Sequence, residues 1–171
     1  MAVTTGEQFS GRILVVDDDP AVRTLLRRML VSGGYALEEA IDGPQALEVC
    51  SQFRPHVVLL DVLMPGMTGF EVCTRLQSLP DTQRPTVLMI TSLADQESVD
   101  KAFEVGAADH ISKPIHLPLL RRRVQHLVQA KKIEEALRNA RDELETRVTH
   151  RTAALEQVGR ASCRERVSSV V

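Results

Sequence analysis

The sequence is poor in the residues that mark secreted, membrane-spanning and nucleic-acid-binding proteins. Its 171 residues include no Trp, one Tyr and three Cys, and the formal net charge is −2. The Cys residues are odd in number, far apart and form no CxxC pair, which argues against a disulfide framework and favours a reducing, cytoplasmic compartment. No apolar run approaches the ~20 residues of a membrane span, so no membrane partner is expected. The small net charge gives no reason to expect a nucleic acid as partner.

The composition that remains is that of a soluble globular domain with an extension. Hydrophobic residues make up 43% and charged residues 26% of the chain, and its length exceeds the ~100–150 residues of a common single domain. Residues 1–10 are polar and lack the apolar core of a secretion signal, so we expect a flexible N-terminus. Cys50 and Cys73 fall on the apolar sides of predicted helices and are expected in the core.

The most informative stretch runs from Val57 to Gly66. Four apolar residues lead directly into Asp61, and a Pro-Gly turn follows. An uninterrupted apolar run of this length predicts a strand that is buried on both faces. Asp61 would then lie at the carboxyl end of the strand, which is the edge where open α/β sheets bind ligands.

The rest of the chain alternates predicted strands with predicted helices. The strands are expected at residues 12–16, 35–41, 57–61, 86–90 and 108–112. The helices are expected at about residues 22–30, 43–53, 70–79 and 95–105, with a last one from about residue 117 onward. Strict alternation of this kind predicts a parallel sheet with helices on both faces.

Acidic, hydroxyl and basic residues follow four of these strands. Asp17 and Asp18 follow the first strand, Asp61 the third, Thr91 the fourth and Lys113 the fifth. In a parallel sheet these residues meet at one edge, where three carboxylates and one ammonium leave an excess of negative charge. A hard cation such as Mg²⁺ would neutralise that charge. A carboxylate facing such an ion can act as a nucleophile toward a phosphoryl group.

Each of these residues also has a purely structural explanation. Asp19 before Pro20 is most simply a helix N-cap, Thr91 could be a turn hydroxyl, and Lys113 could be a counter-ion. A structural ion-pair cluster is therefore the alternative to a phosphoryl-transfer site.

Together these motifs resemble the signature of response-regulator receiver domains of two-component signalling. The matching residues are Val15-Val16-Asp17-Asp18, Leu60-Asp61 followed by Met64-Pro65 and Gly69, Ile90-Thr91-Ser92, and Lys113-Pro114. The resemblance covers residues 11–128. It implies an α/β, flavodoxin-like doubly wound fold with a five-stranded parallel sheet in the order 2-1-3-4-5 and an extended C-terminal α-helix.

The resemblance also implies how the metal would be held and what Asp61 would do. Asp61 would accept a phosphoryl group from a sensor histidine kinase or a phosphotransfer protein. Mg²⁺ would be bound by Asp18, Asp61 and the backbone carbonyl of Leu63, with Asp17 acting mostly through water. Lys113 would pair with the phosphoryl oxygens.

The same resemblance implies a switch made of Thr91 and His110. Thr91 would hydrogen-bond the new phosphoryl group, and the Lys113–Pro114 bond is expected to be cis. His110 stands where the family usually has Tyr or Phe, so the switch side chain is smaller and can carry a charge. A second departure is Thr68, which stands just before Gly69 where an acid is often found.

The last predicted helix continues beyond the receiver. From Ala130 to Val158 the seam positions recur at spacings of 3-4-3-4-4-3-4-3. This pattern predicts a coiled coil over residues 129–158 with one stutter between Leu144 and Val148, and hence a homodimer. A solvated single helix is the alternative.

This segment also resembles the signalling-helix linkers that join receivers to output domains. Residues 159–171 lose the pattern, so we expect a non-native or disordered tail there.

The function implied is a phosphorylation-activated switch with slow self-dephosphorylation, and not a turnover enzyme. One alternative is an aspartyl-phosphate phosphatase of the haloacid-dehalogenase type, which also uses Asp and Mg²⁺. That chemistry needs a second acid two residues after the nucleophile, where this chain has Leu63. A constitutive coiled-coil scaffold with a vestigial receiver is a third possibility, and the intact acidic, Thr and Lys set argues against it.

Overall fold

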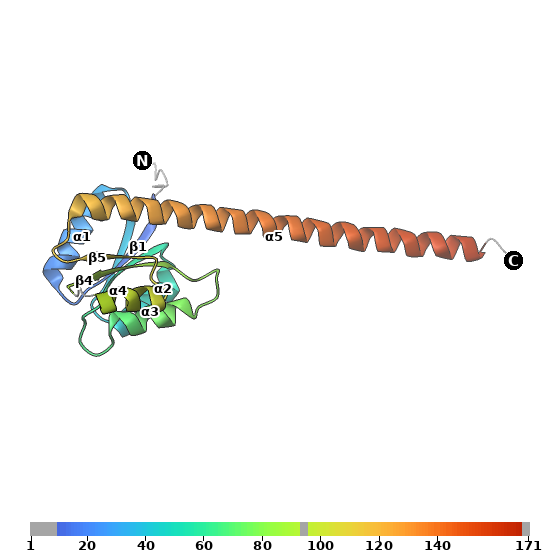
Figure 1. Cartoon of the computed structure of the whole chain (residues 1–171). Coiled ribbons are helices and arrows are strands. Elements are labelled where there is room, and N and C mark those ends of the chain that lie inside the picture. Colours follow the sequence, from blue (N-terminus) through green and yellow to red (C-terminus); the bar gives the residue numbers. More distant parts are fainter. Residues whose placement is uncertain (1–9, 93–95, 169–171) are drawn as a thin grey trace. The chain divides into compact units, whose positions relative to one another are not determined.

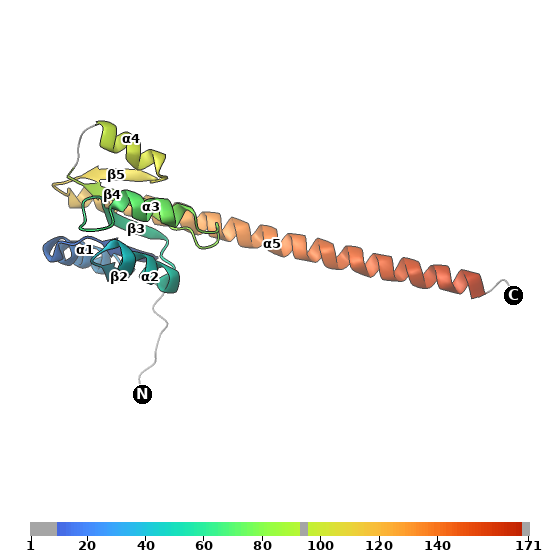
Figure 2. The same cartoon turned by 90° about the horizontal axis from the view of Figure 1, so that it is seen from below.

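The computed structural model describes residues 10–92 and 96–168, which contain a five-stranded sheet (Figure 1). Its strands are β1 (Arg12–Val16), β2 (Ala36–Ala40), β3 (Val57–Asp61), β4 (Thr86–Thr91) and β5 (Asp109–Ser112). The helices are α1 (Pro20–Ser32), α2 (Gly43–Phe53), α3 (Gly69–Gln77), α4 (Gln96–Glu104) and α5 (Leu117–Ser168). All neighbouring strands are parallel in the order β2-β1-β3-β4-β5, so β5 and β2 form opposite edges (Figure 2). The predicted fold class is confirmed.

The sheet separates two apolar clusters. Alternate residues of the fully buried strand β3 face opposite sides, so Val58 and Leu60 join one cluster and Val57 and Leu59 the other. The first cluster is covered by α2, α3 and α4, and the second by α1 and the first turns of α5 (Figure 1). Burial on both faces explains why β3 is an uninterrupted apolar run.

The helices that follow β1 and β3 begin at side-chain caps. Asp19 caps α1 by accepting a hydrogen bond from the backbone N–H of Ala21 at 2.8 Å, as the sequence predicted. Thr68 caps α3 in a capping box, because its backbone N–H donates to Glu71 Oε2 at 2.8 Å while its hydroxyl accepts from the Glu71 N–H. The residue that departs from the commoner family pattern thus has a local structural function.

The observed boundaries differ from the predicted ones by small amounts. Strand β2 starts at Ala36 and ends at Ala40 because it pairs only with the five residues of β1. Strand β5 begins at Asp109, one residue later than predicted, and Thr91 is the last residue of β4. The predicted start of the fourth helix at Asp95 lies outside the described residues.

Both cysteines predicted to lie in the core are buried. Cys50 in α2 is 4% exposed and Cys73 in α3 is fully buried. Burial raises the pKa of each thiol to about 11, so both remain protonated and unreactive at neutral pH.

Helix α5 is continuous but belongs to two compact units, which divide after Lys132. In the first unit, Leu120, Val124 and Val128 are buried in the second apolar cluster, the one covered by α1 and the first turns of α5. In the second unit, the helix is exposed and extends past Val158 to Ser168. This differs from the disordered tail expected from residue 159. One Gly costs only about 1 kcal/mol in a helix, and the segment has no Pro to end it.

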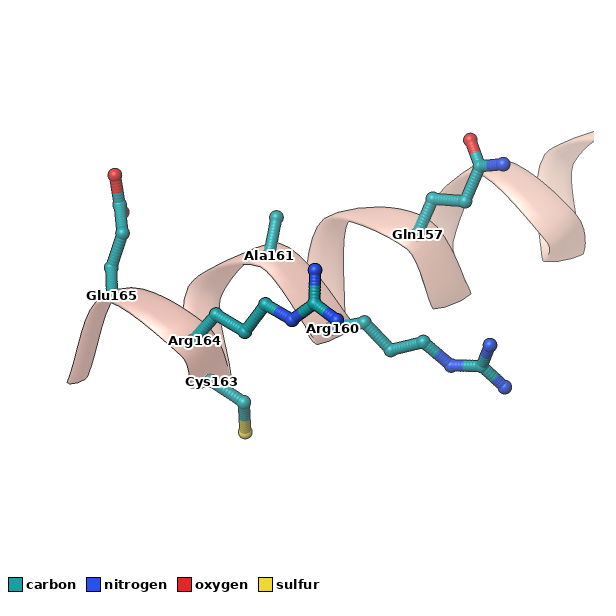
Figure 3. Close-up of a pocket in the computed structure, with 6 residues that line it drawn as sticks. All are labelled: Gln157, Arg160, Ala161, Cys163, Arg164 and Glu165. Carbon is teal, nitrogen blue, oxygen red and sulfur yellow. The ribbon is translucent and has the colours of Figure 1, made fainter. Parts of the chain in front are cut away.

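Figure 3 shows the final described turns of this helix. The side chains that line a shallow hollow there all belong to α5 itself, and they are Gln157, Arg160, Ala161, Cys163, Arg164 and Glu165. The hollow is therefore a groove between side chains of a single helix. No helix in the described part of the chain combines the length and the apolar character needed to cross a bilayer.

Candidate functional site

The predicted site residues lie at the carboxyl edge of the sheet. Asp61 ends β3 and pairs in register with Ile90 of β4, and Thr91 ends β4. Asp17 directly follows β1, while Lys113 directly follows β5 and its backbone N–H donates to the Thr91 carbonyl at 2.8 Å. Parallel pairing thus brings together residues that are far apart in the sequence.

Three carboxylates meet at this edge. Asp17, Asp18 and Asp61 each offer one oxygen, and these oxygens lie within 4.8 Å of one another. Asp17 is 2% exposed and Asp61 is 4% exposed, whereas Asp18 is open to solvent. Two carboxylates about 4 Å apart repel by roughly 4 kcal/mol at an effective dielectric of 20, so the cluster needs positive charge.

Lys113 supplies part of that charge. Its Nζ atom donates a hydrogen bond to Asp17 Oδ2 at 3.0 Å and forms an ion pair with Asp61 Oδ1 at 3.2 Å. The Lys113–Pro114 peptide bond is cis, as the resemblance implied. One ammonium cannot balance three carboxylates.

The pKa directions reflect this imbalance. Burial raises the pKa of Asp61, the charge of Asp17 raises it further, and Lys113 opposes both effects without cancelling them. Burial lowers the pKa of Lys113, but its hydrogen bond to Asp17 and the charge of Asp61 outweigh that effect, so the pKa is raised. The lysine is therefore held in its charged form beside an acid whose negative charge is disfavoured.

The cluster fits a hard divalent cation. Its donors are carboxylate oxygens, the ligand type that Mg²⁺ prefers. Asp61 Oδ1 is buried and already lies 3.2 Å from one cation, the Lys113 ammonium, so this oxygen is placed to contact positive charge. The expected contribution of the Leu63 backbone carbonyl stays a prediction. The Leu63 side chain is 50% exposed. A phosphatase of the haloacid-dehalogenase type requires an acid at this position, and leucine cannot serve as one.

Gly69 explains a further part of the motif. Its backbone N–H donates to the Val62 carbonyl at 2.9 Å, closing the loop that follows β3. A Cβ atom at this position would overlap the backbone carbonyl oxygen of Asp61. Any larger residue would therefore displace the backbone of the acid itself.

One contact was missed by reasoning from sequence. Arg23, one turn into α1, donates from Nη1 to the backbone carbonyl of Asp17 at 2.7 Å and lies 3.9 Å from Glu39 of β2. This contact holds the residue that follows β1 in place. An Arg on an amphipathic helix gives no signal of such a role by spacing alone.

The two predicted switch residues lie on neighbouring strands. Thr91 is 5% exposed at the end of β4. His110 of β5 is partly exposed, and its ring meets Phe103 of α4 edge-on with 5.7 Å between the ring centroids. The His110 Nδ1 atom is buried and has no hydrogen-bond partner. The backbone carbonyl of His110 accepts from Arg123 of α5 at 3.3 Å.

The comparisons with known proteins agree with this geometry. The family model for the response regulator receiver domain matches residues 13–125. PleD, a response regulator of Caulobacter vibrioides, is 41% identical over 130 residues, which cover 76% of this chain and 29% of PleD. A probable cyclic di-GMP phosphodiesterase of Vibrio cholerae is 36% identical over 146 residues, which cover 85% of this chain and 33% of that protein.

Two further relatives extend the comparison. MprA, a response regulator of Mycobacterium ulcerans, is 43% identical over 130 residues, which cover 74% of this chain and 54% of MprA. The crystal structure of a putative response regulator from Chloroflexus aurantiacus matches with a TM-score of 0.66 and 33% identity, over 70% of this chain and 98% of that one. The chain spans only 29% of the length of PleD, 33% of the probable phosphodiesterase and 54% of MprA.

Proposed function

The chain belongs to the response regulator receiver domain family, and from this premise we propose that it is a phosphorylation-activated response regulator whose phosphoacceptor is Asp61. One observation carries the proposal. Asp61 ends the central strand, shares a cluster with two further acids, and lies 3.2 Å from the Lys113 ammonium. A sensor histidine kinase or a phosphotransfer protein is the proposed donor.

The proposed reaction is a phosphoryl transfer from a phosphohistidine. A carboxylate oxygen of Asp61 attacks phosphorus, the new oxygen–phosphorus bond forms, and the nitrogen–phosphorus bond of the donor breaks. The leaving imidazole nitrogen keeps the electron pair and takes a proton from solvent. The product is an acyl phosphate on Asp61 and a free histidine on the donor.

Two side chains of this chain serve that step by their position. Lys113 places its ammonium where the phosphoryl oxygens would arrive, and the Thr91 hydroxyl would donate to one of them once the acyl phosphate has formed. Asp17, Asp18 and Asp61 would hold Mg²⁺, with the Leu63 carbonyl as a further ligand. Bound Mg²⁺ supplies positive charge that neutralises the phosphoryl oxygens.

The relay after phosphorylation would start at Thr91 and His110 and reach α5, through which two copies of the chain would pair. PleD and the probable phosphodiesterase are much longer than this chain, which supports an output domain linked to such a receiver. A haloacid-dehalogenase-type phosphatase is not favoured, because the general acid it needs is replaced by Leu63.

The test is labelling of the full chain with acetyl phosphate and Mg²⁺, followed by intact-mass measurement. We expect one added phosphoryl group, which Asp61→Asn abolishes. Asp81→Asn is the matched control. Asp81 is a surface residue whose side chain is 72% exposed, and it is not part of the acidic cluster of Asp17, Asp18 and Asp61. Undiminished labelling of the Asp61→Asn variant would falsify the assignment.

A further inference from the structure

Asp18 differs from the other two acids of the cluster because its carboxylate has no support of its own. Asp17 Oδ1 accepts a hydrogen bond from the Asp19 N–H at 2.8 Å, and Asp17 Oδ2 accepts one from Lys113 Nζ. Asp61 is paired with the same ammonium. The Asp18 carboxylate is exposed and forms no hydrogen bond or ion pair with any residue that the structure describes. Its position therefore depends on the backbone that carries it.

The peptide group between Asp17 and Asp18 is held by one side chain of α1. Arg23 Nη1 donates to the Asp17 carbonyl oxygen at 2.7 Å, a length typical of a hydrogen bond from a charged donor. On its other side, Asp17 is tied to the sheet, because its backbone N–H donates to the Ala40 carbonyl of β2 at 3.2 Å. A peptide group is planar, so a fixed carbonyl oxygen also fixes the direction in which the chain continues to Asp18.

Arg23 is itself held in this orientation by Glu39 of β2. Only 15% of the Arg23 side chain is exposed, and its Nε atom lies 3.9 Å from Glu39 Oε2. A largely buried guanidinium needs acceptors for its donors, and the Asp17 carbonyl and the Glu39 carboxylate provide them. Glu39 also accepts from Arg27 Nε, one turn further along α1, at 2.8 Å. Both arginines thus contact Glu39, but of the two only Arg23 donates to the Asp17 carbonyl in the described structure.

Arg23 brings a positive charge close to a site that is proposed to bind a cation. Like charges repel, so the charge of Arg23 alone would lower the affinity for Mg²⁺, and its removal would raise that affinity. If Arg23 instead orients Asp18, its removal would lower the affinity, because a ligand would lose its support. The sign of the change in Mg²⁺ affinity therefore separates the two effects.

We propose that Arg23 is a positioning residue for the Mg²⁺ site and that it orients Asp18 through the peptide group between Asp17 and Asp18. The inference rests on the proposed function, in which Asp18 is a ligand of Mg²⁺. It adds to that site a residue of α1 that offers no oxygen to the metal. Residues that support metal ligands commonly contribute about 10–100-fold to metal affinity.

The first experiment compares the Mg²⁺ affinities of variants of the full chain by calorimetric titration. Arg23→Met removes the charge and the donors but keeps an unbranched stem, and it should weaken Mg²⁺ binding about tenfold. Arg27→Met is the matched control. It removes the same charge from the next turn of α1, together with a contact to Glu39, and should leave the affinity unchanged or slightly raised. An Arg23→Met variant that binds Mg²⁺ as tightly as the unsubstituted protein, or more tightly, would overturn the proposal.

Arg23→Lys separates the hydrogen bond from the charge. The lysine ammonium keeps the positive charge and can still donate to the Asp17 carbonyl. This variant should therefore bind Mg²⁺ more tightly than Arg23→Met, even though its charge repels the ion. Equal or weaker binding by Arg23→Lys would show that the hydrogen bond to the Asp17 carbonyl does not support the site.

A double-variant cycle shows whether Arg23 acts through Asp18. In an Asp18→Asn background the carboxylate to be oriented is absent, so Arg23→Met should change the remaining Mg²⁺ affinity little. A full tenfold loss in that background would refute the route through Asp18. Urea unfolding of the same proteins measures stability separately. Both Arg23→Met and Arg27→Met lose a contact with Glu39, so a purely structural role would lower the Mg²⁺ affinity of both variants.

Failure of this inference can be told apart from failure of the proposed function. An unsubstituted protein that binds no Mg²⁺ would refute the proposed metal site and the role of Arg23 with it. Unchanged Mg²⁺ affinity in Arg23→Met, with normal labelling of Asp61 by acetyl phosphate, would refute the role of Arg23 alone.

Discussion

The Nζ atom of Lys113 lies 3.2 Å from Oδ1 of Asp61, and this contact joins the residue after the edge strand β5 to the end of the central strand β3. The pKa of the acid is nevertheless raised, because burial and the neighbouring Asp17 outweigh the lysine. The negative charge of Asp61 is thus a source of instability in the metal-free protein and a source of affinity for cations.

Asp61→Asn should raise the melting temperature of the metal-free protein at neutral pH. A raised pKa in the folded state means that ionisation opposes folding, so the stability of the unsubstituted protein falls as pH rises from the unfolded pKa of about 3.9 through the raised folded pKa. The Asp61→Asn variant has no carboxyl group to ionise at this position, so it does not lose stability in this way. We expect a gain of a few degrees, since 1 kcal/mol corresponds to about 2–4 °C in a chain of this size.

Two controls accompany this measurement of thermal unfolding in chelator. The gain should vanish below about pH 3.5, where the unfolded-state carboxyl is itself protonated. Saturating Mg²⁺ should reduce the difference in melting temperature between the two proteins. The unsubstituted protein binds the ion more tightly and is therefore stabilised more. A variant less stable than the original at neutral pH in chelator would contradict the charge argument.

Mg²⁺ affinity should depend on Asp18 much more than on Asp19. Asp18 offers an oxygen to the acidic cluster, whereas Asp19 caps α1. Asp18→Asn should weaken binding at least about tenfold, since changes even beyond the direct ligands cost about 10–100-fold. Asp19→Asn should leave binding nearly unchanged, because Asn caps helices as well as Asp. Calorimetric titration with Mg²⁺ compares them, and greater damage from Asp19→Asn would mean that the assignment is one residue out.

Thr68→Ala should destabilise the receiver without preventing labelling of Asp61. The substitution removes the hydroxyl that accepts from the Glu71 N–H, and loss of an N-cap costs about 1 kcal/mol. Urea unfolding monitored by circular dichroism measures the change. Thr68→Ser retains the hydroxyl and is the matched control. Equal stability of all three proteins would show that the capping box is energetically neutral.

His110→Phe should stabilise the unphosphorylated protein. The substitution removes a buried Nδ1 atom that has no hydrogen-bond partner and keeps an aromatic ring edge-on to Phe103. An unsatisfied buried polar atom costs about 1–3 kcal/mol. His116→Phe, at an exposed position, is the control and should give no gain. A lower melting temperature for His110→Phe would mean that the imidazole is satisfied in solution.

Much of the site could be predicted because its parts lie at the ends of apolar strands. The uninterrupted run of β3 and strict β–α alternation predict a parallel sheet, and a parallel sheet brings Asp17, Asp61 and Lys113 to one edge. The N-cap role of Asp19 followed from Pro20 beside it. These inferences depend only on period and position, which a sequence displays directly.

The remaining features depend on distances between segments. The contact of Arg23 with the Asp17 carbonyl requires a side-chain direction that no spacing encodes. The capping role of Thr68 could have been predicted, because Thr-x-x-Glu before an apolar run is the capping-box pattern, but Thr68 was interpreted only as a departure from the commoner family pattern. Element ends shifted by one or two residues, since pairing and fraying decide where a strand or helix stops.

The loop between β3 and α3 has a practical consequence for reporting on phosphorylation. The two ends of the loop are joined by the hydrogen bond from the Gly69 N–H to the Val62 carbonyl. Close to the α3 end of the loop, Met67 packs against Gly43, where a Cβ atom would clash with it. Gly66 has a φ of +82° and nothing within 4 Å of a Cβ placed there. A short dye-bearing insertion beside Gly66 would therefore sit a few residues from the phosphoacceptor without disturbing either anchor, which makes this tip a natural attachment point for a fluorescent sensor.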